Sequence, residues 1–209
     1  MELQRAIFLD RDGTLIEDVG HLHRNEDIHI YPVAFEAVRK INQSRALAIV
    51  STNQSAIASG LLDEKQLADL HGFLQEEFQR EEARIDAFFY CPHHPEAGTG
   101  TYTQQCLCRK PEPGMLMLAA RELQVEMTSS YMIGDTLRDV EAGHRAGCRS
   151  VLVKTGHGED ELKLLDQDDT EAPHLEEPLQ TPDHVAGNVL NAVDWIMEKP
   201  CEKQSGITH

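Results

Sequence analysis

The feature of this 209-residue sequence that most limits its fold is the alternation of short apolar runs with longer segments of helical period. The apolar runs, which are typical of buried strands, span residues 6–9, 46–50, 87–90, 131–133 and 150–153. Between them, leucine, alanine or valine recurs every three or four positions over residues 33–43, 63–82, 113–124 and 138–146. This order predicts an α/β fold: a Rossmann-like parallel sheet with helices on both faces.

The C-terminal part of the chain is expected to complete the same domain. Residues 184–186 predict a short edge strand, and residues 189–197 a closing helix. The segment 159–178 holds nine carboxylates, one lysine and two prolines, so we expect an acidic, mobile surface loop over about 158–182. A single domain over residues 1–198 and a flexible tail over 199–209 follow from this reading.

The balance of charges limits the partners. Against 19 basic side chains stand 36 acidic ones, a formal net charge of -17, which argues against nucleic acid or an anionic membrane surface as a partner. The first residues run directly into an apolar strand without the pattern of a signal peptide, and no run approaches the roughly 20 apolar residues that cross a bilayer. We therefore expect a cytoplasmic protein and, without a heptad seam, a monomer.

Two carboxylates follow the first predicted strand at once, in the run Asp10-Arg11-Asp12-Gly13-Thr14. Open α/β sheets bind ligands at the carboxyl ends of their strands. There, Asp10 could attack a phosphorus atom, while Asp12 could protonate the leaving oxygen and then deprotonate water. Aspartate and glycine are also common in solvated turns, so this run alone leaves both interpretations open.

Three further features favour a phosphate site. Thr52 and Asn53 close the second strand with a hydroxyl and an amide that can bind phosphoryl oxygens, and Lys110 follows an arginine in a stiff turn. Asp135 lies between another strand and a helix, where its carboxylate can bind Mg²⁺. Mg²⁺ would neutralise the repulsion between an attacking carboxylate and a phosphate dianion. These residues predict a magnesium-dependent phosphatase.

The order Asp10-x-Asp12-Gly13-Thr14, Thr52, Lys110 and Gly134-Asp135-x-x-x-Asp139 resembles the four motifs of the haloacid dehalogenase superfamily of phosphatases. The resemblance spans residues 6 to 153 and implies that Asp10 is the nucleophile and Asp12 the general acid and base. It also implies phosphate binding by Thr52, Asn53 and Lys110, and a Mg²⁺ ion held by Asp10, the Asp12 carbonyl oxygen and Asp135. No large insertion interrupts the motifs, so no separate cap domain is expected.

A second metal site is indicated by two short clusters, which contain Cys91 and His93 and then Cys106 and Cys108. Three thiolates and one imidazole suit a closed tetrahedral zinc site, in which zinc is structural because no position is left for water. We expect a zinc-bound loop over 91–108, which would hold the following residues, Arg109 and Lys110, in a fixed position. A disulfide or free buried thiols are the alternatives.

The zinc loop, with Cys-Pro-His-His followed by Cys-x-Cys-Arg-Lys-Pro, resembles two groups of that superfamily. They are the D-glycero-D-manno-heptose 1,7-bisphosphate 7-phosphatases and the histidinol-phosphate phosphatases, and the heptose enzymes are the closer match over residues 10–16, 18–23, 52–55 and 109–115. That resemblance implies a small sugar-phosphate substrate contacted by Asp18, Gly20, His21, Gln54, Ser55, Arg109 and Thr136. The alternatives are another small phosphate ester, including histidinol phosphate, or a non-catalytic phosphate-binding module. A phosphatase of nucleic-acid ends would need a basic groove.

Overall fold

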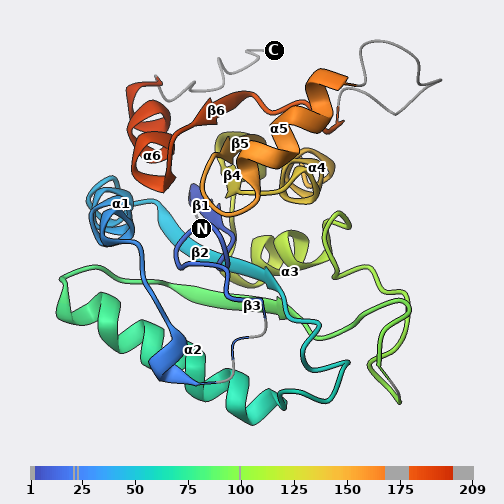
Figure 1. Ribbon diagram of the computed structural model, residues 1–209. Helices are drawn as coiled ribbons and strands as arrows, with labels where there is room; N and C mark the ends of the chain where they lie inside the picture. Colours follow the sequence, from blue (N-terminus) through green and yellow to red (C-terminus); the bar gives the residue numbers. More distant parts are fainter. Residues whose placement is uncertain (1–2, 21, 23, 99, 168–178, 200–209) are drawn as a thin grey trace.

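The computed structural model describes residues 3–20, 22, 24–98, 100–167 and 179–199. Its strands are β1 (Ala6–Leu9), β2 (Leu47–Asn53), β3 (Ala87–Cys91), β4 (Tyr131–Gly134), β5 (Arg149–Val153) and β6 (His184–Ala186). They form one six-stranded sheet in the order β3-β2-β1-β4-β5-β6, and every neighbouring pair is parallel (Figure 1). The predicted α/β parallel fold is confirmed.

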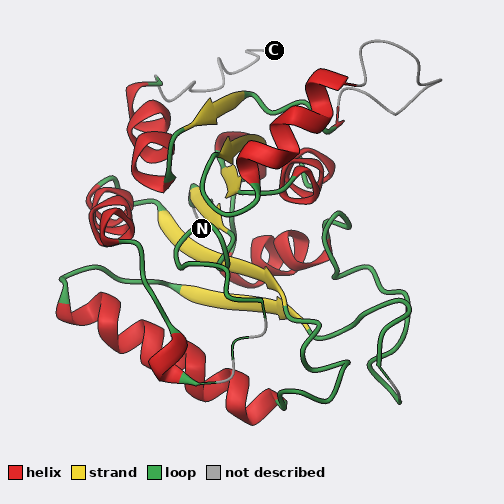
Figure 2. Cartoon of the chain, in the orientation of Figure 1, coloured by secondary structure: helices red, strands yellow, loops and turns green. Residues whose placement is uncertain are grey.

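Helices alternate with these strands along the chain (Figure 2). They are α1 (Pro32–Gln43), α2 (Glu64–Arg80), α3 (Gly114–Leu123), α4 (Leu137–Arg145), α5 (Gly158–Gln167) and α6 (Val189–Glu198). A short 3-10 turn, Asn25–Asp27, lies in the connection between β1 and α1, and the described residues of this connection form no other helix or strand. The helices, strands and 3-10 turns of the described residues thus form one sheet and the elements around it.

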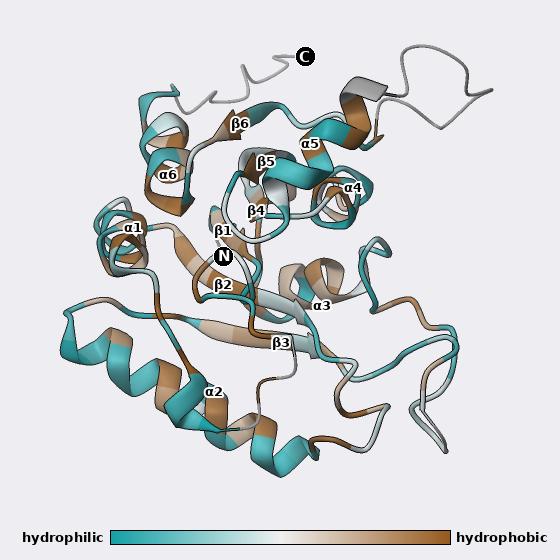
Figure 3. Cartoon of the chain, viewed as in Figure 1, coloured by the Kyte–Doolittle hydropathy of each residue, from teal (hydrophilic) through white to brown (hydrophobic). Residues whose placement is uncertain are grey.

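The two faces of the sheet are covered by different helices, because successive side chains of a strand point to opposite faces. Ile7 and Leu9 of β1 pack in the core that α1, α2 and α6 cover, whereas Ala6 and Phe8 belong to the core under α3 and α4. Figure 3 shows the matching pattern on the helices, with hydrophobic residues toward the sheet and hydrophilic residues outward. This arrangement leaves the carboxyl ends of the strands accessible beyond the helices.

Two helices begin at reciprocal caps that the sequence encodes. At the start of α2, the Asp63 carboxylate accepts a hydrogen bond from the Gln66 amide nitrogen at 2.7 Å, and the Gln66 side chain accepts from the Asp63 amide nitrogen at 2.9 Å. Thr136 and Asp139 form the corresponding pair at the start of α4. Each pair satisfies backbone donors that a helix start otherwise leaves without partners.

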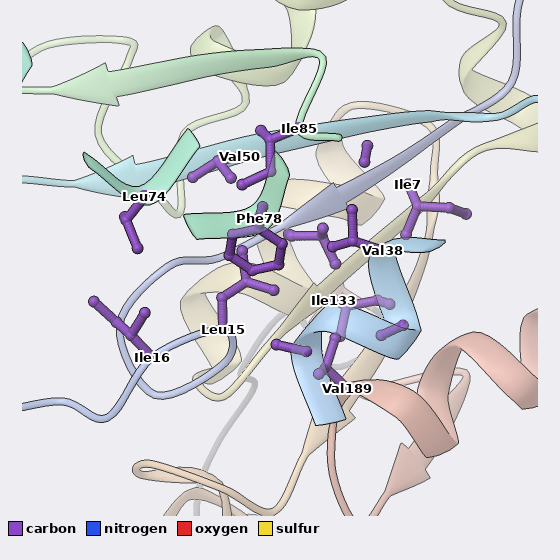
Figure 4. Close-up of a cluster of buried hydrophobic side chains, with 14 of the residues drawn as sticks. Ile7, Leu15, Ile16, Val38, Val50, Leu74, Phe78, Ile85, Ile133 and Val189 are labelled. Atoms are coloured by element: carbon purple, nitrogen blue, oxygen red, sulfur yellow. The ribbon is translucent and has the colours of Figure 1, made fainter. Parts of the chain in front are cut away.

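Phe78 of α2 lies at the centre of the larger core (Figure 4). Its side chain is fully buried and its ring lies 5.0 Å from that of Phe35. We expect Phe78→Ala to lower the free energy of unfolding by about 3–5 kcal/mol, because the remaining core cannot fill the cavity. Denaturant unfolding measures the loss, with Leu107→Ala as a control that changes stability by at most about 0.5 kcal/mol, since Leu107 is 77% exposed. A loss below about 1 kcal/mol for Phe78→Ala would contradict this packing.

The prediction of a mobile acidic loop is wrong for residues 158–167, which form α5; residues 168–178 lie outside the described part of the chain. Three of the carboxylates, Glu159, Asp160 and Glu161, lie in the first turn of the helix, where its dipole favours negative charge. Asp160 also accepts a hydrogen bond from Lys163 at 2.7 Å. A high density of acidic residues therefore does not distinguish a solvated loop from a helix with an acidic first turn.

Within the described residues, none of the helices combines the length and the hydropathy that a membrane-spanning segment needs.

Candidate active site

A cleft of about 210 Å³ opens where the strand order reverses, between the ends of β1 and β4. The chain leaves β1 toward β2 on one side, and β4 continues toward β5 on the other, so the connections diverge there and leave room for a ligand. Asp10 follows β1 and Asp135 follows β4. The cleft is lined by Asp10, Asp12, Asp18, Gly20, Leu22, Thr52, Asn53, Gln54, Ser55, Ala56, Arg109, Lys110, Asp135, Thr136, Arg138, Asp139 and His157.

Lys110 is the cation at the floor of this cleft. Its Nζ donates to Asp10 Oδ1 at 2.8 Å and to the Ser51 carbonyl oxygen at 2.8 Å, and it also pairs with the Asp139 carboxylate. The Lys110 side chain is only 3% exposed. Burial lowers its pKa, but Asp10 and Asp139 outweigh that effect and raise it, so Lys110 remains charged. The ammonium thus holds Asp10 in one orientation at the end of β1.

The residues around Lys110 fit a divalent cation. Ligand atoms of Asp10, Asp135 and Asp139 lie within 4.8 Å of one another, and all three side chains are buried. Asp135 Oδ2 accepts from the His157 amide nitrogen at 2.9 Å, whereas its buried Oδ1 has no hydrogen-bond partner among the described residues. A buried carboxylate oxygen that accepts no hydrogen bond is free to bind a metal ion.

The pKa values of these carboxyl groups are also consistent with a cation site. Burial raises the pKa of Asp10 to about 7, and the nearby Asp139 and Asp12 charges add to the increase although Lys110 opposes it. Burial and the charges of Asp10 and Asp139 raise the pKa of Asp135 to about 8. Lys110 pairs with Asp10 and Asp139, and a cation bound between these carboxylates would favour their ionised forms.

Gly13 brings the turn after β1 against Asp135. Its φ is +76°, and a Cβ atom at this position would lie 2.1 Å from Asp135 Oδ2. A second glycine, Gly156, approaches the same carboxylate from the loop after β5, where a Cβ would lie 2.2 Å from Asp135 Oδ2. Both positions require glycine, because any side chain would displace the carboxylate that faces the metal position.

Asp12 is held by a network that sequence reasoning missed in part. Arg11 donates to both Asp12 carboxylate oxygens from Nη2 at 3.0 Å, and Gln54 Nε2 donates to Asp12 Oδ2 at 2.9 Å. Gln54 also donates to Thr52 Oγ1 at 2.8 Å. The Asp12 side chain is 22% exposed, so this carboxylate faces the cleft. Nothing in the sequence indicates this role of Arg11, because an arginine between two aspartates is expected to be exposed to solvent.

Two residues that were predicted to contact phosphate or substrate form hydrogen bonds to neighbouring residues of the protein. Asn53 pairs with the Lys110 backbone, accepting from its amide nitrogen at 3.0 Å and donating to its carbonyl oxygen at 3.1 Å. Thr136 donates its hydroxyl to Asp139 at 2.6 Å. The structure therefore gives the Asn53 amide and the Thr136 hydroxyl positioning contacts within the cleft wall. Predicted residue His21 lies outside the described residues.

The loop after β1 meets the loop after β5 at the mouth of the cleft. Asp18 Oδ1 accepts from the Gly20 amide nitrogen at 2.7 Å, and Asp18 Oδ2 lies 3.0 Å from His157 Nε2. Gly20 has a φ of +79°, which suits glycine in this turn. His157 was missed by sequence reasoning, because it lies beyond the last motif and follows a glycine like many surface residues.

The four predicted zinc ligands come together at the end of β3, which holds Cys91, and on the loop that follows it. Cys91 Sγ, His93 Nδ1, Cys106 Sγ and Cys108 Sγ lie within 4.8 Å of one another, and five of the six separations run from 3.2 to 3.6 Å. A tetrahedral site with zinc–sulfur bonds of about 2.3 Å places its ligands about 3.7 Å apart. None of the described cysteines forms a disulfide. The donor set therefore fits one tetrahedral metal ion.

The Cys/His cluster is connected directly to the cleft. Arg109 follows Cys108 and donates from Nη1 to the His93 carbonyl oxygen at 3.1 Å. His94 is turned away, since its Nδ1 accepts from the amide nitrogens of Glu96 and Ala97 at 3.1 and 2.7 Å. The cluster thus anchors the turn that carries Arg109 and Lys110 into the cleft.

Comparison with known proteins agrees with this site. A family model described as haloacid dehalogenase-like hydrolase matches residues 19–147, more than half of the chain. A D-glycero-beta-D-manno-heptose-1,7-bisphosphate 7-phosphatase of Photorhabdus laumondii is 41% identical over 152 residues, covering 72% of this chain and 81% of that protein. The enzyme of the same name from Escherichia coli K12 is 39% identical and covers 72% and 80%.

A solved structure supports the same relationship. The D,D-heptose 1,7-bisphosphate phosphatase from B. bronchiseptica, complexed with magnesium and phosphate, superposes with a TM-score of 0.78 at 28% sequence identity. The match covers 94% of this chain and 100% of that one. With its parallel sheet, its aspartate-bearing strand ends and these relatives, the chain belongs to the haloacid dehalogenase-like hydrolase family.

Proposed function

We propose that this protein is a phosphatase that removes the 7-phosphate of D-glycero-β-D-manno-heptose 1,7-bisphosphate. The main observation in favour of phosphatase chemistry is that Asp10, hydrogen-bonded to Lys110, lines the same cleft as Asp12. The substrate is supported by the relatives, which carry that activity in their names at 37–41% identity over most of this chain.

In the first proposed step, an Asp10 carboxylate oxygen attacks the phosphorus atom of the 7-phosphate. A bond from Asp10 to phosphorus forms as the bond from phosphorus to the sugar oxygen breaks, and Asp12 gives that leaving oxygen a proton. Lys110 binds the phosphoryl oxygens from the floor of the cleft, while Thr52 lines its wall. The products of this step are the sugar alcohol and an aspartyl phosphate.

In the second proposed step, Asp12, now a carboxylate, takes a proton from water as the water oxygen attacks the same phosphorus atom. The bond from phosphorus to Asp10 breaks, inorganic phosphate leaves, and both aspartates return to their starting state. Gln54 and Arg11 support this exchange of roles by holding Asp12 toward the cleft.

We propose that the carboxylates of Asp10 and Asp135, with the Asp12 carbonyl oxygen, hold the catalytic Mg²⁺. The partnerless Asp135 Oδ1 supports this assignment. Asp139 is committed to Lys110 and Thr136, so we assign it to positioning. When bound, Mg²⁺ supplies positive charge that offsets the repulsion between Asp10 and a phosphate dianion.

The other end of the substrate faces two arginines. Arg109 and Arg138 both line the cleft, and each brings positive charge that can bind the phosphate that is not removed. Burial and the Arg138 charge lower the pKa of Arg109, and an anion bound beside both guanidinium groups would offset this repulsion. Asp18, Gly20 and Ser55 also line the cleft and can contact sugar hydroxyls.

We also propose that Cys91, His93, Cys106 and Cys108 hold a structural zinc ion. The separations of the four donor atoms support this, because they suit a tetrahedral site whose four protein ligands would leave no position for water. Zinc bound there would keep Arg109 and Lys110 in place.

Phosphate release from a panel of esters tests the proposed function. The panel contains both anomers of heptose 1,7-bisphosphate, histidinol phosphate and 4-nitrophenyl phosphate, each with Mg²⁺ and with the metal chelated. We expect the β-anomer to give the highest kcat/KM, at least about 10-fold above the other esters, because correctly bound remote groups contribute to the rate. We also expect chelation to abolish turnover.

Two outcomes would contradict the proposal in different ways. A preference for histidinol phosphate would preserve the phosphatase chemistry and overturn the heptose assignment. No phosphate release from any ester, with Mg²⁺ present, would favour a non-catalytic phosphate-binding module.

A further inference from the structure

His71 of α2 is a buried histidine outside the cleft that the proposed chemistry does not use. Its side chain is 7% exposed, and its ring stacks on Phe88 with centroids 4.5 Å apart and planes 19° apart. Tyr90 lies edge-on at 6.1 Å. The polar contact of this ring is to Arg11, whose Nη1 lies 3.3 Å from His71 Nε2. A histidine in an apolar, aromatic setting therefore meets the arginine that holds Asp12.

The direction of this hydrogen bond follows from the chemistry of the two groups. A guanidinium has donors and no acceptor, so His71 Nε2 must accept. Burial, and after it the Arg11 charge, lowers the pKa of His71 to about 3, so the imidazole is neutral at physiological pH and can accept. His71 is thus a permanent acceptor for Arg11.

With this contact, each of the three guanidinium nitrogens of Arg11 has a hydrogen-bond partner. Nε donates to Asp12 Oδ1 at 3.2 Å, and Nη2 donates to Gln54 Oε1 at 2.9 Å as well as to Asp12. Nη1 faces His71. The Arg11 side chain is 2% exposed, so water cannot replace a lost partner.

We propose that His71 is a positioning residue for the reaction, which acts through Arg11 to hold the Asp12 carboxylate toward the leaving oxygen. The inference rests on the proposed phosphatase function and extends it to a residue two contacts away from the reacting atoms. Without an acceptor at Nη1, the buried guanidinium turns toward other partners, and the planar fork that fixes Asp12 turns with it.

A misplaced proton donor has a distinctive kinetic signature. A sugar alcohol is a poor leaving group and needs the proton from Asp12, whereas 4-nitrophenolate leaves without one. The value of kcat/KM reports the steps up to the first irreversible one, the transfer of the phosphoryl group to Asp10. A defect confined to Asp12 therefore lowers kcat/KM for alkyl phosphates and spares the aryl ester.

The test compares two amides at position 71 in the full-length protein. In His71→Gln the amide oxygen reaches the place of Nε2 and can accept from Arg11, whereas the shorter side chain of His71→Asn cannot. We expect His71→Asn to lower kcat/KM for heptose 1,7-bisphosphate about 10- to 100-fold and for 4-nitrophenyl phosphate less than about 3-fold. His71→Gln should restore most of the loss. His71→Leu, which also lacks an acceptor, should match His71→Asn and serves if the latter does not fold.

Leu74→Ala, one turn further along the same buried face of α2, is the matched control. It should lower the thermal midpoint without changing the ratio of the two kcat/KM values. Equal losses on both esters in His71→Asn, or a His71→Gln variant as impaired as His71→Asn, would overturn the positioning role. If the wild-type protein ignores the heptose but cleaves another alkyl phosphate, the proposed substrate fails, and the same ratio measured with that ester still decides the role of His71.

Discussion

Asp10→Asn is expected to lower kcat/KM for heptose 1,7-bisphosphate by at least about 10⁴-fold, the largest effect of any single substitution in the cleft. The amide cannot attack phosphorus, and no other cleft carboxylate can take its place. Asp12 is held by Arg11 and Gln54, and Asp139 is paired with Lys110 and Thr136. Turnover therefore depends on the carboxylate of Asp10, which follows β1.

The same substitution should leave the fold intact. Burial raises the pKa of Asp10 to about 7, so the ionised carboxylate is costly to the metal-free fold, and asparagine imitates the protonated form. Lys110 retains Ser51 and Asp139 as partners. We expect a thermal midpoint in the metal-free protein that is no lower than that of the wild type.

Three measurements test this prediction together: kcat/KM, the thermal midpoint, and mass spectrometry of rapidly quenched protein. The wild type should carry one phosphoryl group on Asp10 during turnover, and Asp10→Asn should carry none. Asp160→Asn, the same change on an exposed carboxylate of α5, is the control and should behave as wild type. Residual turnover above about 1% in Asp10→Asn would exclude a covalent intermediate on this residue.

Much of the architecture could be predicted from the sequence, because local patterns and global fold agree. The buried runs at residues 6–9 and 131–133 became neighbouring central strands, and their alternating side chains pack against different helices. The placement of Asp10 and Asp135 followed from this order, since parallel strands end at the same edge. The Cys/His cluster was also predictable, because few other arrangements use three thiols and an imidazole on one short loop.

What the sequence could not predict was how the cleft residues share their hydrogen bonds. Asn53, Gln54 and Thr136 carry polar groups suited to a substrate, yet their side chains bind Lys110, Asp12 and Asp139. Such choices depend on distances between segments far apart in the chain. The contact between Arg11 and His71, 60 positions apart, is of the same kind. Periodicity places His71 on a buried helix face but says nothing of its partner.

The second large effect concerns the Cys/His cluster. We expect Cys108→Ser to lose about one equivalent of zinc, to lower the thermal midpoint by about 5–10 °C, and to lower kcat/KM about 100-fold. Serine is a poor zinc ligand, and the three remaining donors hold the ion weakly. Activity falls because Arg109 and Lys110 follow position 108 directly, and a shift of about 1 Å in a catalytic cation can cost about 100-fold in rate.

Zinc content measured by atomic emission, together with the thermal midpoint and kcat/KM, tests this expectation. Cys148→Ala is the matched control, because Cys148 is a buried thiol outside the cluster and its loss should leave the zinc content unchanged. If Cys108→Ser kept both its zinc and its activity, Cys108 would not be a zinc ligand, and the proposed four-donor site would be wrong.

A chelator experiment separates the two metals, because only one of them is expected to be part of the fold. Mg²⁺ binds through a few oxygen ligands and exchanges readily, whereas a zinc ion closed in by four protein donors is released slowly. A brief chelator treatment should therefore abolish turnover without changing the thermal midpoint, and added Mg²⁺ should restore full activity. Prolonged treatment should remove zinc as well, and Mg²⁺ alone should then fail to restore the rate. Complete recovery with Mg²⁺ after zinc has been lost would show that the turn holding Lys110 keeps its geometry without the cluster, and the proposed link between the two sites would be wrong.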